Sequence, residues 1–332
     1  MMSDIKFLKN IVDDSYSDDW IINKFIVFES INSIFFLIYT NELKSIISYD
    51  IINNKRINEV KNAHKNFISN FRYHLDEINN RDLILSLSPD DNNIKIWNIN
   101  SMDCLLDIKN IYSSGYLISA SFLKDNNQIL ITVSNSEADK NEDLEGIQIL
   151  DFKGRKIKKI KNSNEDTRFV DSYYDKLLSK NFILVCCKKY SKIYDYIKNE
   201  LFHKYSDNGE PCELLANQKD EMTELFESSY DGIIRIWSFY SALLKKKIKI
   251  FNNALSQICL WDNDYLFIAC DDAKIRLVDY NKGEIIHKLC EHKDIVISIK
   301  KIVHPHYGKC LLSQAANENC IKLWIIKNNY EN

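Results

Sequence analysis

The residues whose types could bind a metal ion or catalyse a reaction are one pair of cysteines and one pair of histidines. Cys186 and Cys187 are adjacent in an apolar, strand-like run, so their side chains are expected to point to opposite faces and not to share one metal ion. His304 and His306 flank a proline and could present two imidazoles on one side, although such loop pairs are mostly solvated. The sequence has no His-Glu-x-x-His motif, no Cys-x-x-Cys motif and no glycine-rich phosphate loop. We therefore expect no metal, no cofactor and no catalytic residue.

Two lysine-rich runs, residues 155–161 and 245–250, could contact phosphate groups. Neither is interleaved with aromatic residues, as a stacking platform for single-stranded nucleic acid would be. Both fall where the outermost strand of a repeat is expected, and lysine on an edge strand discourages unwanted strand pairing. We favour this structural role over phosphate binding and expect no specific nucleic-acid partner, in keeping with the formal net charge of −3.

The composition indicates a soluble globular protein, with 45% hydrophobic and 27% charged residues. The longest apolar run, residues 34–39, is far below the roughly 18 residues of a membrane span, and the N-terminus lacks the hydrophobic stretch of a secretory signal. The nine cysteines are scattered and odd in number, which favours reduced thiols. We expect no membrane span and an intracellular location, cytoplasmic or nuclear.

The elements that position the residues discussed above come from a segment that is repeated along the chain. Strand-like stretches of alternating apolar and polar residues recur about every 46 residues, close to the roughly 40–45 residues of a propeller blade. Their shared position is occupied by Tyr49, Trp97, Leu150, Tyr194, Trp237, Val278 and Trp324. The sixth repeat shows four strands, at residues 256–261, 265–269, 274–280 and 284–289. Paired asparagines mark many turns, where they can replace glycine at positive φ.

The pattern predicts an all-β fold, a seven-bladed β-propeller of four-stranded antiparallel blades. The last repeat lacks a fourth strand, and residues 5–12 form a spare one, which we expect to join the last blade and close the ring. We expect residues 1–332 to form a single domain. Its blades are predicted at residues 25–62, 64–111, 115–162, 168–206, 212–252, 255–291, and 294–327 together with 5–12.

At these positions the sequence resembles the WD-repeat family. Units of that family carry a His before the first strand, an Asp in the turn before the third strand, and a Trp-Asp pair at its end. The matching residues are His64, Asp91 and Trp97 in repeat two; Asp231 and Trp237 in repeat five; Asp272 in repeat six; and His292, Glu318 and Trp324 in repeat seven. Repeats three and four are the most degenerate, with Leu150-Asp151 and Tyr194-Asp195.

The resemblance implies that these residues form a hydrogen-bonded network inside each blade, which must be satisfied throughout to be stable. We interpret them as structural and not as a catalytic His–Asp pair, because no nucleophile with a base and an oxyanion site is visible. The leading hypothesis is a non-catalytic protein–protein interaction scaffold or adaptor. One alternative is a substrate-recognition subunit of a ubiquitin ligase, although no Trp at the repeat position is followed by the Asp-x-Arg sequence that such subunits often carry. The other, less favoured, is an enzyme with a site at the mouth of the central channel.

The partners implied are other proteins or peptides, with no small-molecule substrate, and we expect the chain to be monomeric on its own. In the family's network the His-bearing loop and the acidic turn meet, so both lie on one face of the ring, which we expect to bind the partner. The candidate contact residues in its turns are Asp90, Tyr230, Asp271 and Asn317. An acidic insertion at residues 135–146 adds Glu137, Asp139, Glu142 and Asp143, which could steer a basic partner. Ordinary turn chemistry and a solvated loop are the competing interpretations.

Overall fold

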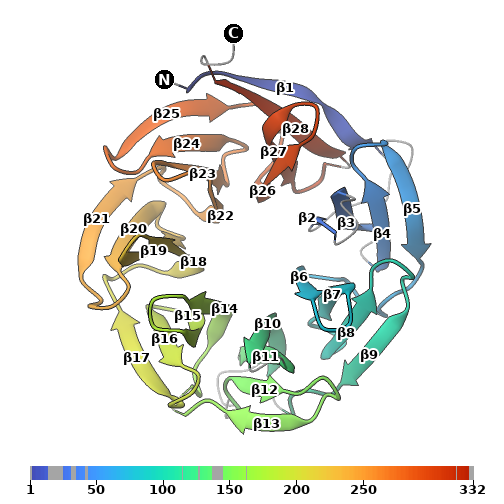
Figure 1. The fold of residues 1–332 in the computed structure, drawn as a ribbon. Coiled ribbons are helices and arrows are strands. Elements are labelled where there is room, and N and C mark those ends of the chain that lie inside the picture. The colour runs from blue at the N-terminus through green and yellow to red at the C-terminus, as the bar shows by residue number, and fades with distance from the viewer. Residues whose placement is uncertain are drawn as a thin grey trace. The chain divides into compact units, whose positions relative to one another are not determined.

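The structure is a computed structural model that describes residues 2–13, 25–30, 35–41, 44–113, 115–125, 128–136, 145–161, 163–318 and 320–328. These residues form 28 strands and no helix. The strands make seven four-stranded antiparallel sheets, each a blade (Figure 1). The chain is therefore the seven-bladed β-propeller that the repeat predicts.

The chain divides into two compact units, and the expectation of a single domain stays a prediction. Unit 1 comprises residues 1–63 and 250–332 and holds blades one, six and seven. Blade one consists of β2 (Phe25–Glu29), β3 (Phe35–Asn41), β4 (Ser45–Asp50) and β5 (Lys55–Val60). Blade six consists of β22 (Leu255–Leu260), β23 (Tyr265–Cys270), β24 (Ile275–Asp279) and β25 (Glu284–Leu289). Blade seven consists of β26 (Val296–His304), β27 (Gly308–Ala315), β28 (Cys320–Asn328) and β1 (Met2–Asp13).

Unit 2 comprises residues 64–249 and holds blades two to five. Blade two consists of β6 (Asn70–Asp76), β7 (Arg81–Ser88), β8 (Asn93–Asn98) and β9 (Cys104–Lys109). Blade three consists of β10 (Tyr116–Asp125), β11 (Gln128–Ser136), β12 (Gln148–Leu150) and β13 (Lys156–Lys159). Blade four consists of β14 (Thr167–Asp175), β15 (Lys180–Cys187), β16 (Ser191–Asp195) and β17 (Glu200–Tyr205). Blade five consists of β18 (Pro211–Lys219), β19 (Met222–Ser229), β20 (Ile233–Ser238) and β21 (Leu244–Lys249).

The N-terminal strand completes the last blade, as predicted for residues 5–12. Strand β1 pairs antiparallel with β28 from Met2 to Asp13, which supplies the fourth strand that the last repeat lacks. The Phe7 ring meets the Trp324 ring edge-on, with the ring centroids 5.8 Å apart. Ile11 is buried, and its carbonyl oxygen accepts a hydrogen bond from the Tyr49 hydroxyl of blade one at 3.0 Å. The closing strand is therefore held by both blades seven and one.

The shared repeat position lies in the third strand of every blade and marks the same irregularity each time. In blade two, Trp97 lies opposite Cys104 on the fourth strand, whereas Ile96 lies opposite Leu106, so the fourth strand carries one extra residue. The same one-residue shift occurs at this position in the other six blades. Such a β-bulge increases the local twist of a strand. Blades three and four have it too, so they are regular despite their degenerate sequences.

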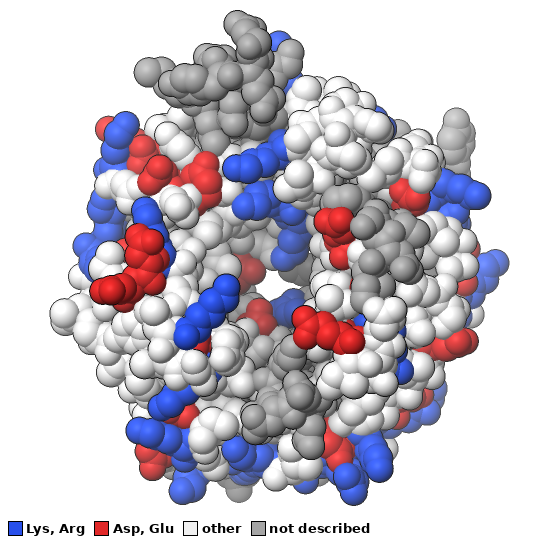
Figure 2. Space-filling model, in the orientation of Figure 1, with Lys and Arg blue, Asp and Glu red and all other residues white. Residues whose placement is uncertain are grey.

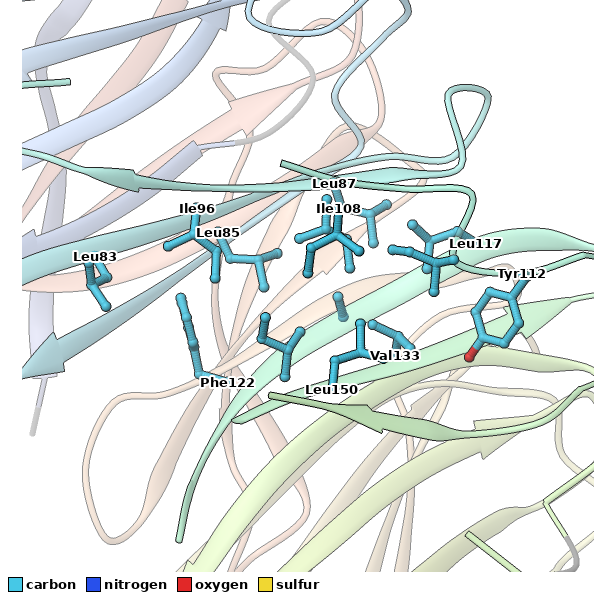
Figure 3. Packing of buried hydrophobic residues seen from close by; sticks show 14 residues of the cluster. Leu83, Leu85, Leu87, Ile96, Ile108, Tyr112, Leu117, Phe122, Val133 and Leu150 are labelled. Atoms are coloured by element: carbon cyan, nitrogen blue, oxygen red, sulfur yellow. The ribbon is translucent and has the colours of Figure 1, made fainter. Parts of the chain in front are cut away.

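Apolar side chains fill the space between neighbouring blades within each unit. Figure 3 shows the cluster between blades two and three, where Leu85 and Ile96 from one sheet face Phe122 and Val133 from the other. Similar clusters join blades three and four, four and five, six and seven, and seven and one. Blades three, four and seven are thus packed on both faces, and truncating such a buried leucine to alanine is expected to cost about 2–5 kcal/mol.

The observed turns and edges follow the sequence closely. The four strands predicted for blade six are found within one residue at either end. Of the thirteen non-glycine residues with positive φ that are described, eight are asparagine, as expected of a chain that replaces glycine with asparagine in its turns. Both lysine-rich runs lie in fourth strands, β13 and β21, where they occupy the sheet edge.

Candidate functional site

Blade seven contains a complete hydrogen-bonded chain. The Trp324 indole donates to the Ser313 hydroxyl oxygen at 2.7 Å, and this hydroxyl lies 2.7 Å from His292 Nε2. On the other side of the ring, His292 Nδ1 lies 2.7 Å from Glu318 Oε2, which also accepts from the Lys322 ammonium at 2.6 Å. Burial lowers the pKa of His292, so the imidazole is neutral and donates from Nδ1. Every member of the chain then has a partner.

Ionisation of Glu318 completes this arrangement. Burial raises the pKa of its carboxyl, but the hydrogen bonds from His292 and Lys322 outweigh burial and lower the pKa to about 2. A second oxygen of the carboxylate accepts from the backbone N–H of Lys293 in the loop before β26. The network therefore ties that loop to the turn before β28 within one blade.

Blade two repeats the chain with one link missing. The Trp97 indole donates to the Ser86 hydroxyl at 2.8 Å, and that hydroxyl lies 2.7 Å from His64 Nε2. The Asp91 carboxylate is 3.9 Å from His64 Nδ1, which has no hydrogen-bond partner in the described structure. Instead, Asp91 accepts from the backbone N–H of Lys65 at 2.8 Å. Asp91 also accepts from the Asn66 backbone N–H at 3.1 Å, so its carboxylate is held by the loop, and we attribute the lost contact to this and to the side chain being one methylene shorter than that of Glu318.

In blades five and six the acid of the turn before the third strand pairs with an arginine of that strand and not with a histidine. In blade five, Arg235 lies 2.6 Å from Asp231 and 2.9 Å from Asp207, and its side chain is 3% exposed. The Trp237 indole N–H has no partner among the described residues, so the structure does not bring Trp237 and Asp231 into one hydrogen-bonded chain. In blade six, the Arg276 guanidinium donates two hydrogen bonds, of 2.7 and 2.6 Å, to the Asp272 carboxylate.

The four predicted contact turns differ in what surrounds them. Asp90 is exposed. Asp271 accepts from the Ser256 hydroxyl at 3.0 Å, and the Asn317 amide donates to Asp294 at 2.6 Å, both of which are ordinary turn chemistry. Tyr230 differs, because it is 49% exposed and lines a cavity.

This cavity belongs to unit 2 and has a volume of about 550 Å³. We call it the Tyr230 cavity, and it is lined by Ile118, Ser136, Asp166, Thr167, Arg168, Glu210 and Tyr230. These residues come from three successive blades, at or next to the starts of first strands, the end of β11 and the turn after β19. They share the end of the sheets that carries the acidic turns, which is the end expected to bind a partner.

One arginine dominates the polar chemistry of the cavity wall. The Arg168 guanidinium lies 4.8 Å from the centroid of the Tyr230 ring and donates to Glu210 at 3.1 Å. Its Nη1 is buried and has no hydrogen-bond partner within the described residues. The Tyr230 backbone N–H donates to the Glu210 carbonyl oxygen at 2.9 Å, which fixes the turn beside the loop before β18. The Asp166 carboxylate pairs with no described side chain.

Four predicted contact residues of the acidic insertion lie outside the described residues, namely Glu137, Asp139, Glu142 and Asp143. Glu145, at its end, accepts from the Ser113 hydroxyl at 2.7 Å and lies 3.3 Å from the Lys156 ammonium. Figure 2 shows Lys and Arg interspersed with Asp and Glu over the described part of the face in view, and neither sign covers it.

The cysteine and histidine pairs lie apart from any cluster of ligands. Cys186 and Cys187 belong to apolar clusters on opposite faces of blade four, as the strand period predicts. The His304 and His306 rings are 5.6 Å apart, and His304 is buried at the end of β26. Within the described ranges, no group of three or more His, Cys, Asp or Glu side chains could hold a metal ion. No helix in the described part of the chain is long and apolar enough to cross a membrane.

Several residues of these sites escape prediction from the sequence. Ser86 and Ser313 each precede the repeat tryptophan by eleven positions. This common spacing is a sequence signal from which their place in the network could have been predicted. A cation two positions before the shared residue recurs in five repeats, at Lys95, Lys192, Arg235, Arg276 and Lys322. Arg168 and Glu210 carry no local signal, because they are 42 residues apart, one at the start of β14 and the other in the loop before β18.

Comparison with known proteins gives a partial similarity. No protein-family model matches the chain. The chain is similar to the U3 small nucleolar RNA-associated protein 21 homolog of Schizosaccharomyces pombe, with 29% identity over 103 residues. The matched stretch covers 31% of this chain and 11% of that protein's length.

Proposed function

We propose that the chain is a WD-repeat propeller that acts as a non-catalytic scaffold or adaptor for other proteins. The His–Ser–Trp chains of blades two and seven support the family, since they contain the residues that the family resemblance implies. The partial similarity to the small nucleolar RNA-associated protein agrees with it. These histidines are buried, which fits a role in holding each blade together better than one in binding substrate.

The observation that carries the binding role is the Tyr230 cavity. An exposed aromatic ring offers a large contact area at low entropic cost, and the volume of about 550 Å³ falls in the range of about 300–1,000 Å³ typical of ligand sites. Three blades contribute to its lining, so a rigid scaffold positions it. We place the partner-binding surface at this end of unit 2, with Tyr230 as its anchor.

Quantitative affinity purification tests this proposal. The tagged chain and its Tyr230→Ala and Arg168→Ala variants are captured from native lysate, and recovered proteins are compared by mass spectrometry. Leu243→Ala is the matched control, because Leu243 is 67% exposed in the turn before β21, at the other end of blade five. We expect partners that are recovered with the wild type and the control and lost with both cavity variants. Recovery that is equal for all four proteins would contradict the proposed surface.

The cellular location is a separate part of the proposal. We place the protein inside the cell, in the cytoplasm or nucleus, in line with the name of the similar protein, which associates that protein with a nucleolar RNA. Imaging of the tagged chain tests this placement, and secretion of the protein into the medium would contradict it.

A further inference from the structure

We propose that the Tyr230 cavity receives a lysine or arginine side chain from an extended segment of the partner protein. This inference rests on the proposed scaffold function and names the chemistry of the ligand. It starts from the charges of the cavity wall, which comprise two carboxylates, Asp166 and Glu210, and one guanidinium, Arg168.

The guanidinium is already committed to one of the carboxylates. Arg168 Nη2 lies 3.1 Å from Glu210 Oε2, so this pair is neutral as a unit. Asp166 is only partly buried, and no described side chain pairs with it. The wall therefore carries one uncompensated negative charge, which a cationic group would neutralise. A phosphate or carboxylate would instead bring a third anion to the wall and would have to displace Glu210 from Arg168.

The aromatic wall favours the same class of ligand. Tyrosine rings attract ammonium and guanidinium groups within about 6 Å of the ring centroid, and Tyr230 already holds the Arg168 guanidinium at 4.8 Å. The Tyr230–Arg168–Glu210 arrangement is thus an internal example of guanidinium recognition by an aromatic ring and a carboxylate. Tyr230 is 49% exposed as a residue and lines the same cavity as Asp166, so a second cation in the cavity would lie near both.

The surroundings of the cavity suit a peptide segment more than a free cation. Ile118 offers an apolar surface to the aliphatic stem of a lysine or arginine. Arg168 Nη1 is buried and has no acceptor among the residues that the structure describes, so a ligand that reaches it with a main-chain carbonyl would satisfy this donor. A basic side chain with its own backbone would therefore satisfy the free carboxylate and the unpaired donor together.

Peptide selection tests the ligand class directly. A library of random dodecapeptides displayed on phage is selected on the folded wild-type chain, and enriched peptides are synthesised and titrated by fluorescence anisotropy. We expect the enriched peptides to share a lysine or arginine whose replacement by norleucine weakens binding at least tenfold. Asp166→Asn is expected to weaken binding by a similar factor, and Glu210→Gln by a smaller one.

Asp220→Asn is the matched control, because Asp220 is an exposed acid in the turn between β18 and β19, at the other end of blade five. Thermal unfolding confirms that each variant is folded. The proposal is overturned if the enriched peptides are acidic or uncharged, or if no basic peptide loses affinity in Asp166→Asn relative to the control. If lysate partners are still lost with Tyr230→Ala in that case, the scaffold function stands and only the ligand class is wrong.

Discussion

Blades seven and five both bury polar side chains beside the repeat tryptophan, but they satisfy them with different residues. Both carry a tryptophan at the shared position of the third strand and a cation two residues before it. In blade seven the residue opposite this cation is Ser313, whereas in blade five it is Glu227. The serine accepts from the Trp324 indole and bonds His292. The glutamate turns away and accepts from the Ser191 hydroxyl of blade four at 2.6 Å.

The difference shows that one side chain on the second strand decides where the polar core of a blade is anchored. A hydroxyl can donate and accept at once, so Ser313 couples the tryptophan to the histidine inside one blade. Glu227 links two neighbouring blades, and the Trp237 indole has no hydrogen-bond partner among the described residues. Blade five therefore depends on Arg235, which neutralises the acids around it.

Removing Arg235 should have the largest effect. Arg235→Ala leaves Asp207, Asp231 and Glu227 without their shared cation, and breaking a buried pair typically costs about 3–5 kcal/mol. We expect the free energy of unfolding, measured by urea denaturation, to fall by this amount. The matched control is Arg155→Ala, since the Arg155 side chain is 70% exposed in its pair with Asp151. Equal losses in the two variants would show that blade five does not depend on the Arg235 cluster.

Removing the serine of blade seven should have the next largest effect. Ser313→Ala deprives Trp324 of its acceptor and His292 of its hydroxyl partner, and each unsatisfied buried group costs about 1–3 kcal/mol. We expect a loss of roughly 2–3 kcal/mol, measured in the same way. Ser241→Ala, at an exposed serine in the turn before β21, should change stability by less than about 0.5 kcal/mol. A neutral Ser313→Ala would mean that the chain in blade seven contributes no net stability.

The two blades should also respond oppositely to pH. Burial raises the pKa of Glu227 to about 7, although the Ser191 hydrogen bond and Arg235 partly offset it. The folded state then holds this proton more tightly than the unfolded state, so stability is present below the unfolded pKa of about 4.3 and is lost as pH rises towards 7. In blade seven, burial lowers the pKa of His292, so stability is lost as pH falls below about 6.5.

Glu227→Gln separates these contributions. It removes the titrating group of blade five, so the variant should not lose stability as pH rises from 5 to 7, whereas wild type should. We therefore expect the free energy of unfolding of the variant, relative to that of wild type, to be roughly 1–3 kcal/mol higher at pH 7 than at pH 5. The measurement is urea denaturation across this pH range. An unchanged difference between the two proteins from pH 5 to pH 7 would show that Glu227 does not titrate there in the folded chain.

The smallest expected effect concerns the length of the acid. Glu318→Asp should lose the contact to His292, as Asp91 does with His64 in blade two, at a cost of about 1 kcal/mol. Asp91→Glu should supply the missing acceptor, although it must keep the backbone hydrogen bonds of the loop. Differential scanning calorimetry of both variants checks this. A larger loss from Asp91→Glu than from Glu318→Asp would contradict the explanation by side-chain length.

The fold could be predicted because it rests on periodic signals. Alternation within strands, the spacing of the shared position and the spare strand at residues 5–12 are all local or repeated, and the structure follows them even where the Trp is replaced, as at Leu150 and Val278. The cavity could not be predicted in full. Tyr230 was visible as an exposed aromatic in a turn, but Arg168 lies at the start of β14 and Glu210 in the loop before β18, and they meet only once blades four and five are packed together.

The central claim is that the buried polar chains hold the blades together while the Tyr230 cavity binds the partner. The most direct test measures stability and partner recovery on the same proteins, Tyr230→Ala and Ser313→Ala, at a temperature at which both are folded. The account predicts that Tyr230→Ala loses partners with a stability loss of no more than about 1 kcal/mol, the size of its cation–π contact with Arg168, and that Ser313→Ala loses more stability but recovers the same partners. Full partner recovery by Tyr230→Ala, together with loss of partners in folded Ser313→Ala, would contradict it.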